Sequence, residues 1–345
     1  MKKIVGILLV LALVASFAGC GKTAAAPYVG CTIYKFDDTF MSLVRQEIQK
    51  DATDKIKLSV QDSQNSQPTQ NDQVDTFLTQ GVTALALNLV DPSAVSVVIQ
   101  KAKAKNIPVV LFNREPDPTD MAAWNQVYYV GAKAQQSGTY QGEMMAAYWK
   151  AHPAMDLNHD GVLDYVMLMG DPSNTDAKYR TQYSIEALTA AGVKSKVLAQ
   201  DTAMWDRVTA QSKMAAFIAA NPGKIEAVFA NNDDMALGAI EALKAAGLDK
   251  NGKIIPVVGV DATPPGLDAM KQGTLIGTVL NDATRQGDAT YDLAFALGTG
   301  AATISTTVGP LCDQNGTVDA ANGRYVWVPY VKVTPDNYQQ YVAKP

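Results

Sequence analysis

The sequence contains little histidine, cysteine or charge, and each shortage argues against a class of function. Its 345 residues include two histidines, His152 and His159, and three cysteines. Two histidines leave almost no material for a histidine-based metal site or for Ser-His-Asp catalysis. Charged residues make up 18% of the chain, and the 34 acidic residues outnumber the 29 basic ones. An acidic protein is a poor partner for nucleic acid or other anionic polymers, so we expect neither as a partner.

The N-terminal segment is apolar but too short to cross a bilayer. Two lysines precede an apolar run over 4–14, and small residues then lead to Cys20. This pattern predicts a bacterial lipoprotein signal peptide over 1–19, with Cys20 as the lipidated first residue and 20–27 as a tether. We therefore expect an extracytoplasmic folded part that is held at a membrane surface by its lipid anchor alone.

The two remaining cysteines, Cys31 and Cys312, leave two interpretations open. A disulfide between them is compatible with an extracytoplasmic location. Cys31 also lies in an apolar run typical of a strand, where it would serve equally well as a small buried residue.

Strand and helix patterns alternate along the rest of the chain. The expected strands are 28–34, 56–60, 84–87, 108–112, 127–130, 165–169, 194–198, 227–229, 255–260 and 275–279. Helical patterns lie between them, for example over 41–50 and 234–246. Such an order predicts parallel sheets with helices on both faces, so we expect two doubly wound, Rossmann-like α/β domains. The segment 298–322, rich in Gly, Thr and Ala, is expected to be loop.

Residues 156–164 have the spacing of a calcium-binding loop. Oxygen-bearing side chains stand at its alternating positions, Val162 offers a backbone carbonyl, and Gly stands at the sixth position, where such loops turn sharply. The candidate ligands are Asp156, Asn158, Asp160, Val162 and Asp164. Met167 replaces the usual closing Glu, so one ligand must come from elsewhere in the chain. The alternative is a solvated turn, since Asp, Asn and Gly are common turn residues.

Polar side chains follow most of the expected strands, at the edge where parallel sheets bind ligands. They include Asp37, Asp38, Asn113, Arg114, Asp171, Asn174, Asp176, Arg180, Asn231, Asn232, Asp261 and Asn281, with Phe40 and Trp205 nearby. Carboxylates, amides and guanidinium groups supply paired acceptors and donors for vicinal hydroxyls, and aromatic faces can cover the C–H faces of a pyranose. The set favours a sugar site, although each residue alone could instead cap a helix or pack in a core.

Enzyme chemistry finds little support in the sequence. The segment 247–253 has phosphate-loop spacing, but Ile254 replaces the required Ser or Thr, and the segment lies after a helix rather than before one. No nucleophile can be paired with a base. Asp37 and Asp38 are a pair of carboxylates, but a glycosidase would show more exposed clustering of carboxylates with aromatic residues.

From residue 28 to the C-terminus the chain resembles the periplasmic galactose/glucose-binding proteins of sugar ABC importers. The resemblance rests on TIYKFDD at 32–38, NLVDP at 88–92, DTAMWD at 201–206, ANND at 230–233, GVDA at 259–262 and TVLND at 278–282. It implies the type I periplasmic binding protein fold, with three crossovers between two domains that close on one sugar like a hinge. The implied domains are 28–131 with 283–327, and 132–282 with 328–345.

The resemblance also implies a role for each residue of the site. The sugar ring would lie between Phe40 and Trp205. Its hydroxyls would be held by Asp38, Asn113, Asp176, Arg180, Asn232, Asp261 and Asn281, together with Asn174, which stands where the family commonly has His. Glu226 matches the distant Glu of the family's calcium site and would supply the ligand missing at Met167.

We therefore expect a monomeric solute-binding lipoprotein that binds glucose and/or galactose, delivers it to an ABC permease and holds a structural Ca²⁺. Engagement of a chemoreceptor stays open. Because Asn is shorter than His and does not titrate, Asn174 predicts a changed affinity or epimer preference. The alternatives are a binder of a pentose or another small polar solute, a sugar-active hydrolase, and the ligand domain of a regulator. The signal peptide and the lack of a helix-turn-helix pattern argue against the regulator.

Overall fold

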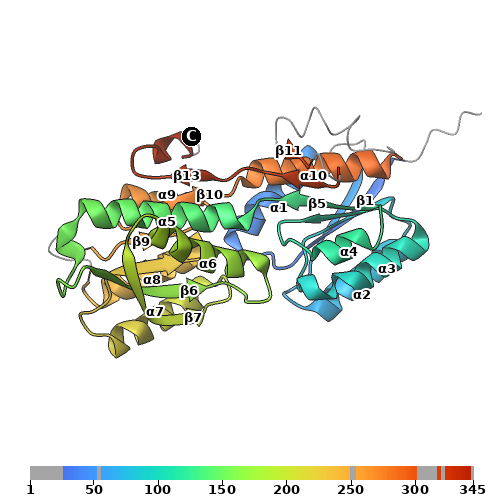
Figure 1. The fold of residues 1–345 in the computed structure, drawn as a ribbon. Coiled ribbons are helices and arrows are strands. Elements are labelled where there is room, and N and C mark those ends of the chain that lie inside the picture. The colour runs from blue at the N-terminus through green and yellow to red at the C-terminus, as the bar shows by residue number, and fades with distance from the viewer. Residues whose placement is uncertain (1–25, 53–55, 249–253, 301–316, 320–322, 343–345) are drawn as a thin grey trace, which may run out of the picture.

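The computed structural model describes residues 26–52, 56–248, 254–300, 317–319 and 323–342. The predicted signal peptide, Cys20, most of the tether and Cys312 lie outside these residues. The described chain forms two lobes, each with a β-sheet between layers of helices (Figure 1). No helix in these ranges is long and apolar enough to cross a membrane. The arrangement confirms the predicted fold of two parallel-sheet α/β domains.

The first lobe is built around a seven-stranded sheet in the order β11-β12-β5-β4-β3-β1-β2, parallel except for the pairing of β11 with β12. Its strands are β1 (Tyr28–Ile33), β2 (Lys57–Asp62), β3 (Ala84–Leu87), β4 (Val109–Phe112), β5 (Val127–Gly131), β11 (Thr317–Val318) and β12 (Tyr325–Trp327). Its helices are α1 (Thr39–Asp51), α2 (Gln67–Thr79), the 3-10 turn η1 (Pro92–Ala94), α3 (Val95–Lys105), α4 (Pro118–Ala122) and α10 (Ala283–Gly298).

Alternation along β1 gives this lobe two hydrophobic cores. Cys31 and Ile33 face one way and pack with α1 and α10, whereas Tyr28 belongs to the core formed with α2 and α3 on the opposite face. Cys31 is a free thiol, and its burial raises its pKa to about 12. The structure thus gives Cys31 the role of a small core residue.

The second lobe holds a four-stranded parallel sheet in the order β7-β6-β8-β9, and β10 pairs antiparallel with β13 beside it. Its strands are β6 (Val162–Met169), β7 (Lys194–Thr202), β8 (Ala227–Ala230), β9 (Val257–Val258), β10 (Thr278–Leu280) and β13 (Val331–Val333). Its helices are α5 (Ala134–Ala151), η2 (Pro153–Met155), α6 (Thr175–Ala190), α7 (Arg207–Ala220), α8 (Asp233–Ala245), α9 (Pro264–Lys271) and η3 (Tyr338–Gln340). One core lies under α5 and α6, the other under α7, α8 and α9.

Several expectations about secondary structure were wrong in detail. β6 begins before the expected residue 165, and β7 continues past the expected residue 198. The strand expected over 255–260 is reduced to β9, because beyond Val258 the backbone forms only isolated bridges to the segment 277–280. The strand expected from Leu275 begins at Thr278, since the N–H of Leu275 bonds to Ala269 O in the turn after α9. Two residues of the segment 298–322, expected to be loop, form β11 by pairing with β12.

The chain passes between the lobes three times. It crosses from β5 to α5, from β10 to α10 and from β12 to β13, so the crossing segments lie near residues 132, 282 and 329. Because the strands are mostly parallel, the loops after β1, β4, β6 and β8 are at the carboxyl edges of their sheets. These loops carry the polar residues singled out in the sequence.

Candidate functional site

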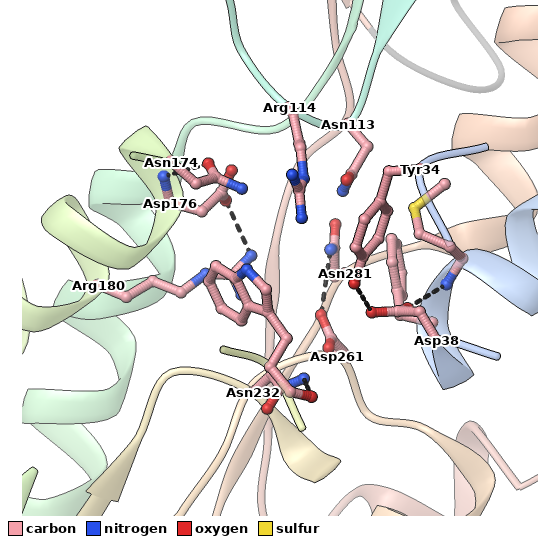
Figure 2. A pocket seen from close by; sticks show the side chains of 13 residues that line it. Tyr34, Asp38, Asn113, Arg114, Asn174, Asp176, Arg180, Asn232, Asp261 and Asn281 are labelled. Carbon is pink, nitrogen blue, oxygen red and sulfur yellow. Dashed lines mark hydrogen bonds and ion pairs between the residues drawn. The ribbon is translucent and has the colours of Figure 1, made fainter. Parts of the chain in front are cut away.

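All ten residues predicted to hold the ligand line one pocket between the two lobes (Figure 2). The pocket encloses about 350 Å³ of empty space, part of which is continuous with solvent. Its lining residues are Asp38, Phe40, Asn113, Asn174, Asp176, Arg180, Trp205, Asn232, Asp261 and Asn281, together with Tyr34, Met41 and Arg114. A pocket of this size suits one compact ligand.

Several of these side chains cap the N-terminus of a helix and also line the pocket. Asp38 accepts a hydrogen bond from Met41 N at 2.7 Å at the start of α1, and Asn232 accepts one from Met235 N at 2.9 Å at the start of α8. Asn174 accepts from Asp176 N at 2.9 Å at the start of α6. The cap uses one oxygen of each side chain. The second oxygen of Asp38 accepts from the Tyr34 hydroxyl and the amide of Asn232 donates to Trp205 O, and each of these groups has further hydrogen-bonding capacity for a ligand. The capping interpretation and the binding interpretation are therefore both compatible with this geometry.

Arg180 organises the polar groups of the second lobe. Its guanidinium donates to Asp176 at 2.9 Å, to Asn231 O at 2.8 Å and to the Tyr330 hydroxyl at 2.9 Å. Burial raises the pKa of Asp176, and Arg180 opposes this shift. Burial likewise raises the pKa of Asp261 well above its usual range, against the effect of Arg180, and Asp261 accepts from Asn281 Nδ2 at 3.1 Å. The pocket is thus lined by buried carboxylates and by two buried cations, Arg180 and Arg114.

Two buried donors in this pocket have no hydrogen-bond partner among the described residues. They are Arg180 Nε and Trp205 Nε1. Buried polar groups are nearly always paired, with protein, water or ligand. A ligand rich in oxygen acceptors would supply the missing partners.

The backbone of Trp205 is held in an uncommon conformation. Met204 and Trp205 have φ values of 54° and 65°, in the left-handed region that residues with a Cβ seldom adopt. The indole packs over Gly170 at the end of β6, where an added Cβ would lie 2.2 Å from the Trp205 ring. The aromatic wall of the second lobe is therefore fixed by a strained turn and a glycine.

Three lining residues were absent from the predicted set. Arg114 stands among the polar residues that follow the strands, but nothing in the sequence distinguishes it from a solvated side chain. Tyr34 lay in a predicted strand, although its position next to Lys35-Phe36-Asp37 at the strand end was a usable signal. Its hydroxyl donates to Asp38 Oδ2 at 2.5 Å. Met41 belongs to the apolar face of α1 and gave no polar signal.

The predicted calcium loop is closed by hydrogen bonds from its own backbone. Asp156 accepts from Asp160 N at 3.1 Å and from Gly161 N at 2.9 Å, and Asp160 accepts from Val162 N at 2.8 Å. Asn158 Oδ1 accepts a further bond from Asp160 N at 3.0 Å. Gly161 has a φ of 73°, as the sharp turn at the sixth position requires.

Glu226 reaches this loop from the start of β8. One carboxylate oxygen accepts from Leu157 N at 2.6 Å and the other from Asp164 N at 2.8 Å. Asp164 itself is buried, and its Oδ1 has no hydrogen-bond partner among the described residues. An all-oxygen donor set with an orphaned buried carboxylate oxygen fits a calcium ion.

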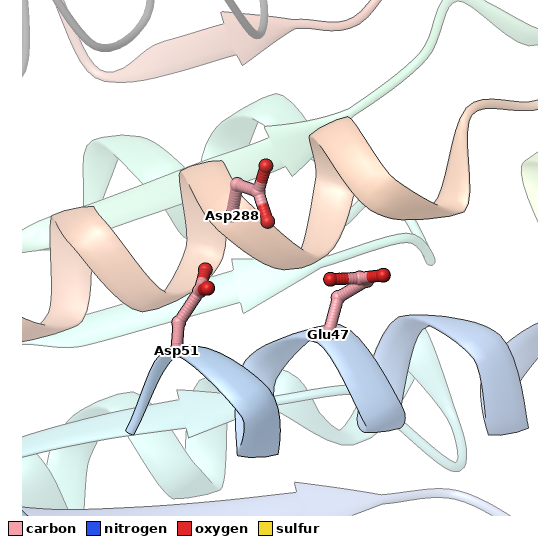
Figure 3. A group of neighbouring side chains, drawn as sticks. All are labelled: Glu47, Asp51 and Asp288. Atoms are coloured by element: carbon pink, nitrogen blue, oxygen red, sulfur yellow. The ribbon is translucent and has the colours of Figure 1, made fainter. Parts of the chain in front are cut away.

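A tighter group of carboxylates lies elsewhere. Among the described residues, three carboxylates come mutually within 4.8 Å at Glu47 and Asp51 of α1 and Asp288 of α10 (Figure 3), and not in the loop, where the carboxylates accept N–H groups. Burial raises the pKa of Asp288 to about 7, with Asp51 and Glu47 adding to the shift. These three residues lie where α1 packs against α10 in the first lobe, and none of them lines the pocket.

Comparison with known proteins agrees with this architecture. A family model described as periplasmic binding protein domain matches residues 29–302. The chain is 46% identical over 317 residues to the D-galactose/methyl-galactoside binding periplasmic protein MglB of Haemophilus influenzae, covering 91% of both chains. It is 32% identical over 283 residues to the xylitol-binding protein of Mycolicibacterium smegmatis, covering 81% of this chain and 75% of that one.

The fold is similar to that of a solved ABC transporter solute-binding protein from Bacillus halodurans with bound myo-inositol. The two structures superpose with a TM-score of 0.76 and share 28% sequence identity, and the match covers 93% of this chain and 98% of the other. The matched family consists of solute-binding proteins and not of enzymes.

Proposed function

The chain belongs to the family of periplasmic binding proteins, the extracytoplasmic solute-binding components of ABC transporters, and from this premise we propose that its ligand is D-galactose and/or D-glucose. The observation that carries the proposal is the convergence of all ten predicted residues on one pocket. A relative that is 46% identical over 91% of the chain and is named for galactose supports the choice of a hexose.

The chemistry of the pocket suits a neutral ligand with many hydroxyl groups. Each hydroxyl can donate to a carboxylate such as Asp261 and accept from an N–H of Arg180 or Asn281, so one ligand satisfies both kinds of group. Phe40 of the first lobe and Trp205 of the second supply apolar faces for the C–H faces of the ring. Arg180 Nε and Trp205 Nε1 lack hydrogen-bond acceptors among the described residues, and sugar oxygens would provide them.

Asn174 would help to determine which sugar hydroxyl is recognised at one position of the pocket. Its Oδ1 accepts from Asp176 N at 2.9 Å, so its amide N–H₂ is the group left to contact a ligand. Asn174 therefore acts as a donor there and selects a hydroxyl that can accept. A longer side chain at this position would reach further into the pocket and alter the choice between epimers.

A structural Ca²⁺ is part of the same proposal. Asp156, Asn158, Asp160, Asp164 and Glu226 would hold it with the carbonyl of Val162. The ion would offset the negative charge of the loop carboxylates and of Glu226, and it would tie the loop to the start of β8. Burial raises the pKa of Glu226, the backbone N–H groups of Asp164 and Leu157 oppose this shift, and the charges of Asp164 and Asp156 add to it.

The proposal extends to the partners and the location of the protein. Lipidation at Cys20 would hold it at the membrane surface beside its ABC permease, and the protein would act as a monomer. A chemoreceptor is a further possible partner for the closed, sugar-bound form. Closure follows from sugar contacts made with both lobes, which stabilise the closed form over the open one.

The deciding experiment is calorimetric titration of the protein lacking residues 1–27 with D-galactose, D-glucose and D-ribose, with calcium and after chelation. We expect one-to-one binding of a hexose, and a lower melting temperature after chelation. Binding of ribose alone would replace the hexose with a pentose. Failure to bind any of the three would refute the proposed ligand class, and an unchanged melting temperature after chelation would refute the calcium site.

A further inference from the structure

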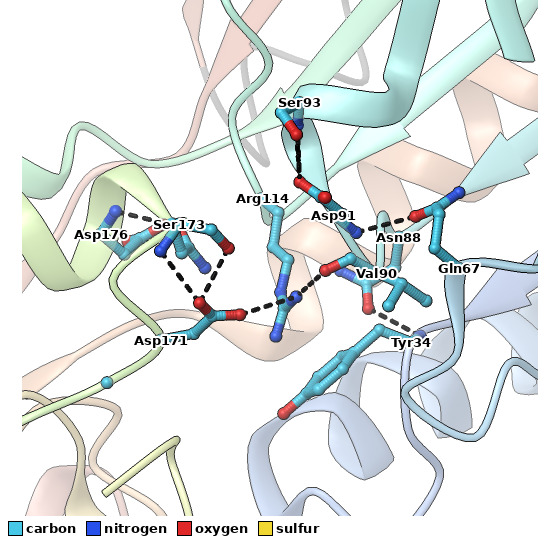
Figure 4. Close-up of polar contacts among 12 residues, drawn as sticks. Tyr34, Gln67, Asn88, Val90, Asp91, Ser93, Arg114, Asp171, Ser173 and Asp176 are labelled. Carbon is cyan, nitrogen blue, oxygen red and sulfur yellow. Dashed lines mark hydrogen bonds and ion pairs between the residues drawn. The ribbon is translucent and has the colours of Figure 1, made fainter. Parts of the chain in front are cut away.

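Arg114 is a buried cation at the boundary between the two lobes. It follows β4 in the first lobe, lines the pocket and is 2% exposed. Its Nη1 lies 3.9 Å from Oδ2 of Asp171, which follows β6 in the second lobe (Figure 4). The ion pair Lys101–Asp75, by contrast, stays within one lobe. The contact between Arg114 and Asp171 therefore exists only while the lobes are together.

Each side chain of this pair is fixed by its own lobe. Arg114 Nη1 donates to Val90 O, and the guanidinium lies 3.8 Å from the centroid of the Tyr34 ring. On the other side, Asp171 Oδ1 accepts from Ser173 N at 2.9 Å and from Ser173 Oγ at 2.7 Å, which leaves Oδ2 turned to Arg114. Little side-chain freedom remains to be lost when the two charges meet, so the contact forms at low entropic cost.

The pair is also connected to the groups that face the ligand. Arg114 contacts the ring of Tyr34, and the Tyr34 hydroxyl donates to Asp38, one of the pocket carboxylates. On the opposite side, burial raises the pKa of Asp176, and Arg180 and then Arg114 oppose this shift. Movement of one lobe relative to the other changes the distance between Arg114 and Asp171 while both pocket halves keep their internal contacts.

We propose that Arg114 and Asp171 form a latch between the lobes that holds the closed form around the bound sugar. The inference rests on the proposed sugar site. Arg114 acts as a positioning residue whose charge slows opening, and thereby sugar release. Because the contact forms after the sugar has entered the open cleft, it affects the dissociation rate and leaves the association rate nearly unchanged.

The chain offers a matched control for a substitution at Asp171. Asp91-Pro92-Ser93 in the first lobe repeats the sequence Asp171-Pro172-Ser173. Asp91 Oδ1 accepts from Ser93 N at 2.9 Å and from Ser93 Oγ at 2.7 Å, the same two bonds at the same lengths. Asp91 is on the side of Arg114 away from the second lobe and forms no ion pair with it (Figure 4). Asp91→Asn therefore reproduces the local change without touching the latch.

The experiment compares wild type, Asp171→Asn, Asp91→Asn, Arg114→Met and the Arg114→Met/Asp171→Asn double variant by stopped-flow tryptophan fluorescence with D-galactose and D-glucose. Asp171→Asn should raise the dissociation rate about tenfold or more and change the association rate less than twofold. Asp91→Asn should leave both rates as in wild type. In the Arg114→Met background, Asp171→Asn should add little, because its partner is already gone.

Each alternative outcome has a distinct meaning. Equal dissociation rates for Asp171→Asn and Asp91→Asn, or full additivity of Arg114→Met and Asp171→Asn, would overturn the latch while leaving the sugar site intact. A wild-type protein that binds neither hexose would instead refute the proposed function. Small-angle scattering of the sugar-saturated proteins supplies a second readout, since loss of the latch should increase the radius of gyration of Asp171→Asn and not of Asp91→Asn.

Discussion

Gly170 is expected to set the position of the aromatic wall of the pocket. A Cβ at this residue would lie 2.2, 2.3 and 2.4 Å from three atoms of the Trp205 indole. Ordinary carbon–carbon contacts begin near 3.5 Å, so the ring of a Gly170→Ala variant must move by about 1 Å or more. Gly170 does not have a positive φ, so the backbone accepts alanine and the clash with Trp205 is the main effect.

The expected loss can be estimated from the cost of overpacking. Forcing one extra methyl group into a packed contact costs about 1–3 kcal/mol. If this cost is borne mainly by the sugar-bound form, the dissociation constant for a hexose rises roughly 5- to 150-fold. The free protein can relax more easily because Trp205 is only partly buried, so its melting temperature should change little.

Calorimetric titration of Gly170→Ala with D-galactose and D-glucose measures this loss. The Trp205→Leu variant and the Gly170→Ala/Trp205→Leu double variant show whether it acts through the indole. Without the large ring, the added methyl group should cost almost nothing further. Hexose binding by Gly170→Ala within twofold of wild type, or an equal loss in the Trp205→Leu background, would refute the reasoning.

Three further predictions concern Glu226 at the calcium loop, Asn174 in the pocket and Asp288 in the carboxylate cluster of α1 and α10. Glu226→Gln should lower the melting temperature in calcium and remove the stabilisation that calcium gives, as measured by thermal unfolding with and without chelator. Asn174→His should change the ratio of the galactose and glucose dissociation constants measured by calorimetry, and an unchanged ratio would contradict the role given to Asn174. Because the folded-state pKa of Asp288 is raised to about 7 from an ordinary 3.8, its stabilising effect is present below about pH 4 and is lost as the pH rises through 7. Asp288→Asn should therefore flatten the fall in melting temperature between pH 5 and pH 8, and an unchanged slope would refute this.

The sequence allowed prediction of the strands and of the polar residues at their ends, because both depend on short-range pattern. β3 has the predicted bounds, since its four residues are all buried and a turn precedes them. The residues after β1, β4, β6 and β8 meet in one pocket because parallel strands place their carboxyl ends at one edge. The strand pattern indicated polar residues at this edge, whereas the choice of the ten binding residues among them came from the family resemblance.

Contacts between distant segments could not be predicted in this way. Tyr330 lies 150 residues from Arg180 and reaches it only because the third crossing passes beside the pocket. The contact of Arg114 with Asp171 depends on how far the lobes have closed, which no local pattern encodes. The length of β9 was overestimated for a similar reason. An apolar run has the same sequence pattern whether its backbone pairs continuously with a neighbouring strand or forms only isolated bridges to it.

The double use of polar side chains determines which substitutions can test this site. Asp38 holds the start of α1 with Oδ1 and accepts from the Tyr34 hydroxyl with Oδ2. Asp38→Ala would remove a helix cap, which costs about 1 kcal/mol of stability, together with any contact to the sugar. Asp38→Asn keeps an oxygen for the cap and removes the negative charge that faces the pocket. A loss of affinity in Asp38→Asn at unchanged stability therefore reports on the sugar contact, whereas the same loss in Asp38→Ala could come from the helix.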